Sequence, residues 1–217
     1  AFEVVATAIF NGGPLGTFPV QGSISRAGEG DPVVWCFSAI RDFELSGLSF
    51  TDVNVEVCKD SDGKITTALN GEVMLEGQKT AFSGGMDISD DSWAMSFEVA
   101  DFPLNDWLLL KSATFNIGGE DAAIELAAEA WVGAGDNPTI LDLVGTYSPE
   151  EAMTLSASLK FGEAWEPLPG TNLSFTEVEG TVTRDELGWG VSLTVSGSWP
   201  LTLAPGLEAD LTQLTGT

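Results

Sequence analysis

Apolar and polar residues alternate with a period of two over long stretches of this chain. Residues 93–100, 153–161 and 189–199 show the pattern most clearly. In each stretch apolar side chains take every second position, and small hydroxyl-bearing or acidic side chains lie between them. This alternation is typical of antiparallel strands with one face on a core and the other in water. Residues 122–132 are rich in alanine but keep the same period, so they too are predicted as a strand.

Turn signals divide these strands at regular intervals. Acidic clusters such as Asp60 to Gly63 recur about every 30 residues, and uncharged Gly or Pro breakers such as Ser46-Gly47 lie about 15 residues out of phase. The spacing predicts an all-β fold, an antiparallel up-and-down meander of about 12 to 14 strands. So many strands do not stay flat, and we expect them to curl into a two-layered sandwich, a tube or a barrel-like structure.

A longer repeat accompanies the turn rhythm. The segment Leu48–Val53 recurs at Leu173–Val178, and a degenerate copy lies at Leu110–Phe115. After Phe50 and Phe175 the apolar phase slips by one residue, which predicts a β-bulge near Thr51 and Asp52. We therefore expect a single domain over 1–217, built from repeats of about 62 residues. The predicted units are a partial repeat 1–46, two full repeats 47–109 and 110–171, and a shortened repeat 172–217. The ragged ends indicate either a piece of a longer array or terminal strands that complete one another's sheet.

The charge of the chain restricts its partners. The 217 residues include 33 acids, 8 lysines and arginines and no histidine, for a net charge of −25. Nucleic acids and anionic membrane surfaces are excluded as partners, because both require clustered basic residues. No apolar stretch is long enough for a transmembrane helix. The chain opens directly into an alternating strand, as a processed domain does, and we expect it to lie outside the cell or on the cell surface. A high-salt habitat fits the few lysines and many acids, because salt screens their repulsion, and an acidic secreted protein from an ordinary habitat fits them equally well.

Two cysteines and one sequon are the candidate covalent features. Cys36 and Cys58 either form a disulfide that closes a loop of about 22 residues or are two buried small apolar residues. Asn172 begins a glycosylation sequon with Ser174, which matters if the protein is secreted.

The acidic turns are the candidate metal site. Asp60 and Asp62 before Gly63 imitate the middle of an EF-hand loop, but Cys58 and Leu69 occupy the positions of the first and twelfth ligands, so an EF-hand is rejected. Stacked strands would nevertheless align the acidic turns along one edge, where Ca²⁺ can relieve their repulsion. The alternative is that the turns are simply solvated. We expect no cofactor unless the turns bind Ca²⁺ weakly, and the candidate ligands for that ion are Asp60, Asp62, Asp90, Asp91, Glu120 and Asp121.

Three tryptophans are candidates for contact with a ligand or partner. Trp107 and Trp165 lie near Gly or Pro turns, and Trp131 has the opposite parity from Ile124 and Leu126. Exposed tryptophan stacks on sugar rings or anchors a protein partner. The alternative is that loops partly bury all three.

Catalysis has little support. Without histidine, the chain lacks histidine-based triads and histidine metal sites, and a cysteine nucleophile would lack its usual base. We expect a non-catalytic extracellular or cell-surface module with a structural or adhesive role, which associates with itself or with other surface proteins. Two alternatives are a module that binds an apolar ligand or carbohydrate, and an outer-membrane barrel, whose strands have a similar pattern.

Overall fold

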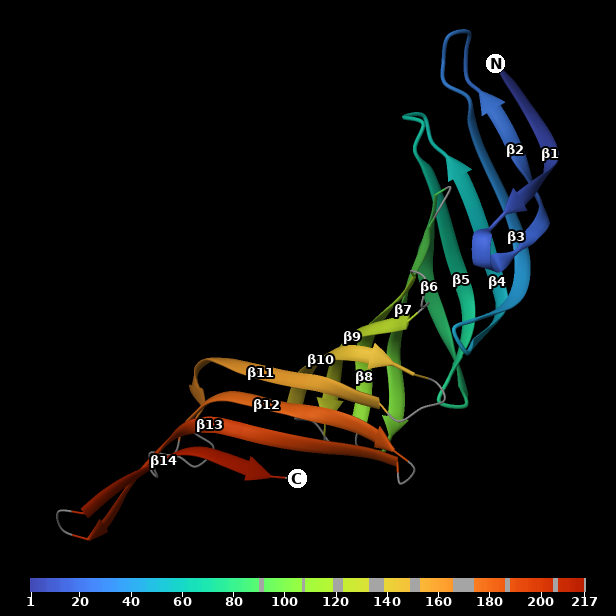
Figure 1. Cartoon of the computed structure of the whole chain (residues 1–217). Coiled ribbons are helices and arrows are strands. Elements are labelled where there is room, and N and C mark those ends of the chain that lie inside the picture. Colours follow the sequence, from blue (N-terminus) through green and yellow to red (C-terminus); the bar gives the residue numbers. More distant parts are fainter. Residues whose placement is uncertain are drawn as a thin grey trace. The chain divides into compact units, whose positions relative to one another are not determined.

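The computed structural model describes residues 1–89, 92–106, 108–118, 123–132, 139–148, 153–165, 174–185, 188–204 and 207–216 (Figure 1). Over these ranges the chain is β structure with one short 3-10 helix, Gly13–Leu15. The strands are β1 (Phe2–Asn11), β2 (Thr17–Arg26), β3 (Val34–Leu45), β4 (Leu48–Lys59), β5 (Ile65–Leu75), β6 (Gln78–Ile88), β7 (Trp93–Asn105), β8 (Leu108–Gly118), β9 (Ala123–Val132), β10 (Thr139–Tyr147), β11 (Met153–Trp165), β12 (Ser174–Asp185), β13 (Gly188–Ala204) and β14 (Leu207–Gly216).

The predicted meander is confirmed. All 14 strands belong to one sheet, and their order in the sheet is their order in the chain. Within the described ranges, no helix has the length and apolar content needed to span a membrane.

The chain separates into two compact units. The first comprises residues 1–102 and 112–125, and the second comprises residues 103–111 and 126–217. The second unit contains β10 to β14, whose resolved pairs are all antiparallel. Leu141, Leu143 and Leu155 are among its fully buried side chains.

In the first unit, buried apolar side chains and exposed polar side chains alternate along the strands, as predicted. Met95, Phe97 and Val99 of β7 are buried, whereas Ser96 and Glu98 between them are exposed. The same separation holds along β4 and β8. We call the buried side the inner face and the opposite side the outer face of this unit.

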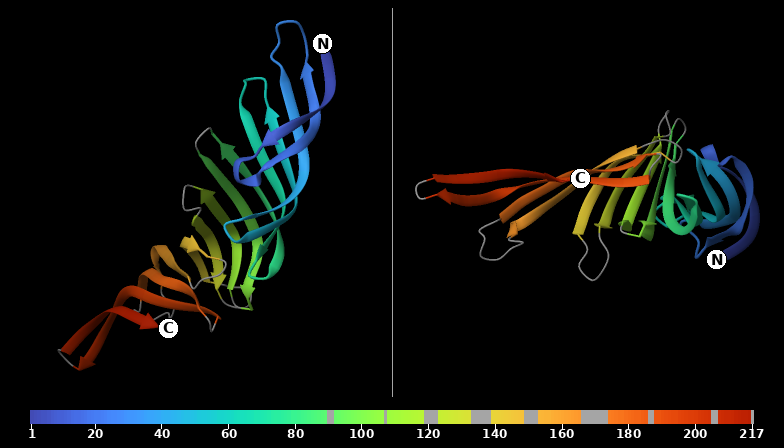
Figure 2. Two further views of the ribbon diagram at one scale, coloured as in Figure 1. Left: turned by 45° about the vertical axis from the view of Figure 1, so that its right-hand side comes forward. Right: turned by 90° about the horizontal axis from the view of Figure 1, so that it is seen from below.

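Aromatic contacts on the inner face show that the first unit is strongly curled (Figure 2). The rings of Phe50 in β4 and Phe97 in β7 lie edge to face with their centroids 5.4 Å apart. In a flat sheet their backbones would be about 14 Å apart, because three strand spacings separate them. Phe82 of β6 contacts both rings, at 5.3 and 5.5 Å. The curl therefore folds the sheet over its own phenylalanines, and one sheet can bury a core without a second layer.

Close backbone approach at two glycines accompanies this curl. A side chain at Gly84 would place its Cβ 2.7 Å from the Cα of Phe97, its partner across β6 and β7. Gly22 has the same relationship to Phe37, its partner across β2 and β3, also at 2.7 Å. Only glycine permits such an approach. The two glycines are 62 residues apart, which is the spacing of the predicted repeat; the repeat and its boundaries stay a prediction.

Two-residue turns join the strands at two of the uncharged Gly or Pro breakers. Ser46 and Gly47 have φ angles of 51° and 78°, and Glu76 and Gly77 have φ angles of 47° and 73°. Two successive positive φ values are characteristic of the type I′ turn, whose twist matches that of a hairpin. Two strands, β4 and β5, lie between these turns, so the breakers recur about every 30 residues.

The predicted β-bulge is confirmed. In the β3–β4 hairpin Phe43 lies opposite Phe50, but Arg41 lies opposite Val53, so β4 contains one extra residue. Asp52, with φ of 53°, lies within this bulge. A second register shift occurs between Phe175 and Glu177 in β12, where the sequence shows the matching slip.

Candidate functional site

The outer face of β3 and β4 brings the two cysteines together. Cys36 and Cys58 lie directly opposite each other, with their Cα atoms 4.1 Å apart, and a disulfide joins them. The hairpin turn at Ser46 and Gly47 would by itself place Cys36 opposite Val57. The extra residue in the bulge moves β4 along by one position, so that Cys58 takes this place.

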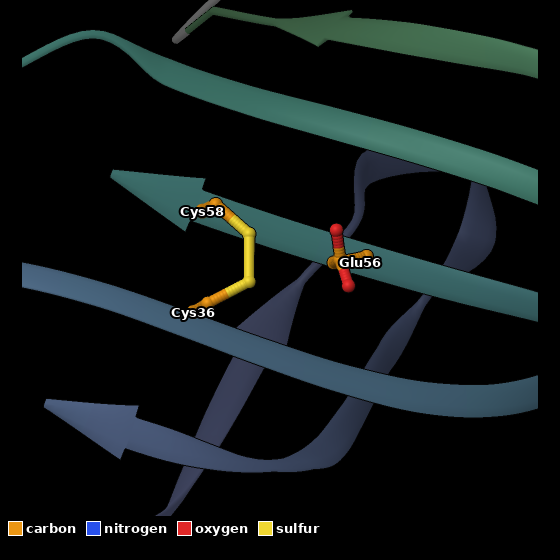
Figure 3. A group of neighbouring side chains, drawn as sticks. All are labelled: Cys36, Glu56 and Cys58. Carbon is orange, nitrogen blue, oxygen red and sulfur yellow. A yellow bond between two sulfur atoms is a disulfide. The ribbon is translucent and has the colours of Figure 1, made fainter. Parts of the chain in front are cut away.

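Glu56 completes a group of three potential metal ligands with these cysteines (Figure 3). It lies on β4 two residues before Cys58, so both side chains are on the outer face. The carboxylate and the two sulfur atoms are all within 4.8 Å of one another. Glu56 is exposed and both cysteines are half-buried. Glu56 is not among the ligands predicted from the sequence, although the spacing Glu-x-Cys in an alternating strand is a signal that indicates it.

The acidic turn at Asp60 is organised by backbone hydrogen bonds. Asp60 Oδ1 accepts hydrogen bonds from the backbone N–H groups of Asp62 and Lys64, both at 2.9 Å. The N–H of Gly63 donates to the carbonyl oxygen of Asp60, and Gly63 has a φ of 86°. These contacts are those of an Asp-Gly turn in which aspartate caps its own loop. One carboxylate oxygen of Asp60 is therefore already occupied.

The predicted Ca²⁺ ligands are only partly described. In the part of the chain that the structure describes, Asp60 and Asp62 do not join a third acid in a group of potential ligands. Asp90, Asp91, Glu120 and Asp121 lie outside the described residues, as does the predicted glycosylation site at Asn172. Calcium binding and glycosylation stay predictions.

Of the three candidate tryptophans, Trp131 is described with its side chain. It is half-buried, its Nε1–H donates a hydrogen bond of 2.8 Å to Glu129 Oε1, and Lys111 Nζ lies 5.1 Å from the ring centroid. Trp165 pairs with Phe175 through β11 and β12, but its side chain lies outside the described part, and Trp107 lies outside it entirely. The described environment of Trp131 is one in which intramolecular contacts cover part of the ring.

A shallow depression crosses the ends of several strands in the first unit. Its volume is about 710 Å³, and Ile65, Met86 and Ile117 supply apolar lining while Lys64, Asp87 and Glu125 supply charges. It is wide enough for a sugar or a small apolar molecule. Its mixed lining does not specify either ligand.

A further feature of the first unit is the edge strand β1. Among the strands that the structure describes, β1 has one neighbour, β2, so its other side is an open edge. Val5 is 82% exposed and Ile9 70%, and Phe2 and Val4 are also exposed. One charged residue, Glu3, lies among its ten residues. Long, apolar and uncharged edges are the ones that pair with another strand.

Comparison of the chain with protein-family models, with curated proteins and with solved structures gave no match.

Proposed function

We propose that this chain is a non-catalytic structural or adhesive module of the cell exterior, and that copies associate by pairing β1 of one molecule with β14 of the next. The observation that carries the proposal is the open edge of β1 with its exposed apolar side chains Val5 and Ile9. Most soluble sheet proteins protect such an edge with charge, proline or a short strand. An edge without such protection is suited to the addition of a strand from another molecule.

The strand order supports β14 of a second copy as the strand that pairs with the open edge of β1. With 14 strands in an up-and-down meander, the first and last strands have opposite directions, so β14 of one copy meets β1 of another as an antiparallel neighbour. Both strands have ten residues, and β14 contains two charges, Glu208 and Asp210. The ladder would therefore extend from copy to copy with the same alternation, and few charges would be brought together.

The net charge predicts how association depends on salt. Two molecules with a charge of −25 repel each other at low ionic strength, and added salt screens this repulsion. We therefore expect association to strengthen as salt rises, the opposite of an assembly held by ion pairs.

Sedimentation and electron microscopy of the full chain at low and high salt test the proposal. We expect end-to-end oligomers or filaments that grow with salt, and their loss when Val5→Glu and Ile9→Glu are combined. The matched control combines Ile40→Glu and Val144→Glu, which add the same charge at residues that are 72% and 60% exposed on interior strands. A monomer at every salt concentration, or equal loss of association in both variants, would refute edge pairing.

A second candidate function is the binding of an apolar ligand or a carbohydrate in the depression lined by Ile65, Met86 and Ile117. Its volume of about 710 Å³ is in the range of small-molecule sites. Native mass spectrometry of freshly purified protein would detect a retained ligand. A mass equal to that of the bare chain, together with no binding to an oligosaccharide panel, would count against this function.

A further inference from the structure

The two cysteines and Glu56 form a group whose chemistry goes beyond a structural crosslink. All three side chains are on the outer face, and none is sealed in the core. A disulfide is also less necessary for stability here than in small secreted domains, because 217 residues bury a core of their own. Exposure to solvent leaves the disulfide open to reductants.

The donor set is suited to a thiophilic divalent cation. Zn²⁺ takes cysteine sulfur at about 2.3 Å and carboxylate oxygen at about 2.0–2.2 Å, in a tetrahedral arrangement. Ligand atoms in such a site are therefore roughly 3.5–4 Å apart. The three donor atoms lie within 4.8 Å of one another, so an exposed glutamate side chain needs to move by about 1 Å.

Space for a fourth ligand lies beside the cysteines. A depression of about 230 Å³ is lined by both cysteines, by the hydroxyl residues Ser23 and Thr66, and by the charged residues Asp60 and Lys59. A water molecule in this depression can complete the tetrahedron and donate hydrogen bonds to the neighbouring oxygens. The large negative charge of the chain adds a long-range attraction for cations.

We propose that Cys36, Cys58 and Glu56 form a redox-gated site that binds a thiophilic divalent cation, with Zn²⁺ as the reference ion, when the disulfide is reduced. An external dithiol supplies two electrons and two protons, the S–S bond breaks, and the reductant becomes a cyclic disulfide. The cation then displaces the two thiol protons and is held by two thiolates and the Glu56 carboxylate. An external disulfide re-oxidises the site by thiol–disulfide exchange: it accepts two electrons from the two thiolates, takes up two protons and leaves as two thiols, while the Cys36–Cys58 bond re-forms and the cation is released.

The geometry makes the two states mutually exclusive. Each sulfur either binds the metal as a thiolate or takes part in the S–S bond. The preformed opposition of the cysteines in the β3–β4 ladder keeps them together in both states, because backbone pairing and not the disulfide determines their register. The site therefore needs little folding on metal binding, unlike a zinc finger. This inference is independent of edge pairing by β1.

The test is titration of the full chain with Zn²⁺ by calorimetry, in the oxidised form and after reduction with a phosphine that binds the metal weakly. Cd²⁺ serves as a spectroscopic probe, because thiolate ligation produces an ultraviolet charge-transfer band that carboxylates do not give. We expect one Zn²⁺ per chain and the cadmium band in the reduced form, neither in the oxidised form, and no competition by excess Ca²⁺, which prefers oxygen ligands.

Variants separate the three ligands. Cys36→Ser and Cys58→Ser should each abolish the cadmium band. Glu56→Gln should weaken Zn²⁺ affinity by about tenfold or more, since even the loss of an outer partner of a ligand costs about 10–100-fold. Glu98→Gln, which removes an exposed acid from the outer face of β7, is the matched control and should bind as the parent does. Absence of the band in the reduced parent protein would overturn the site, and unchanged affinity in Glu56→Gln would overturn the three-ligand set.

Discussion

Asp42 accepts a hydrogen bond of 2.8 Å at its Oδ1 from the backbone N–H of Asp52. Asp52 lies in the bulge of β4, where the extra residue takes its N–H out of the ladder. The carboxylate from the opposite strand thus supplies the partner that the ladder lacks. The bulge determines how β3 and β4 pair from Asn54 onward, and Cys58 lies four positions after Asn54. The hydrogen bond from Asp52 to Asp42 therefore helps to place Cys58 opposite Cys36.

Replacing Asp42 tests this role. Asp42→Ala should lower the free energy of unfolding by about 1 kcal/mol, the usual value of one such hydrogen bond. Asp42→Asn should retain most of the stability, because its amide oxygen can still accept. Urea unfolding followed by tryptophan fluorescence measures the difference. Asp87→Ala, at an exposed acid of β6, is the control, and an equal loss in both alanine variants would show a general charge effect instead.

The contact between Phe50 and Phe97 provides a test of the curl. Both rings are buried, and each also contacts Phe82. Phe97→Ala should cost about 3–5 kcal/mol, because it removes a large side chain from a core that cannot fully collapse around the gap. Phe2→Ala, on the exposed side of β1, should cost much less. If the two variants unfold at similar denaturant concentrations, the inner face is not packed as described.

Gly84 should not tolerate a side chain. Its added Cβ would lie 2.7 Å from the Cα of Phe97, and backbone atoms cannot move aside as a side chain can. Gly84→Ala should therefore destabilise the chain by more than 1–3 kcal/mol, the usual cost of overpacking. The control is Gly190→Ala in β13, whose nearest contact is the Thr183 hydroxyl at 3.2 Å, a group that can rotate. Thermal unfolding compares them, and a tolerated Gly84→Ala would contradict the close approach.

The disulfide should add stability that reduction removes. Cys36 and Cys58 are separated by 22 residues, and a loop of this size is worth roughly 3 kcal/mol on the chain-entropy estimate. Unfolding with and without reductant, in the absence of metal, should differ by that amount. Thiol titration of the unreduced protein should find no free sulfhydryl. Two reactive thiols in material purified without reductant would contradict the bond.

Zn²⁺ should restore part of this stability to the reduced chain. A ligand that binds the folded state shifts unfolding by mass action, by about 2.7 kcal/mol at 100 times its dissociation constant. The increase should be absent from Cys58→Ser. Melting curves of reduced protein at increasing Zn²⁺ measure it, and an identical increase in the serine variant would assign the effect to other acids.

The strands, their antiparallel order and the bulge followed from the sequence alone. They are local properties: alternation decides which side chain faces which side of a strand, and closely spaced turns force neighbouring strands to pair. The phase slip after Phe50 was visible for the same reason, since one inserted residue reverses every later side chain.

The tertiary structure decided the curl of the first unit, the open edges and the opposition of the cysteines. Contact between Phe50 and Phe97 depends on how twist accumulates over three strand spacings, to which every intervening side chain contributes. The group of Cys36, Cys58 and Glu56 depends on a register that combines a turn at Ser46 with a bulge at Asp52. The turn and the bulge are each local features, but together they determine which residues pair several positions away. The alternation of side chains along one strand contains no information about the residue that lies opposite on the next strand.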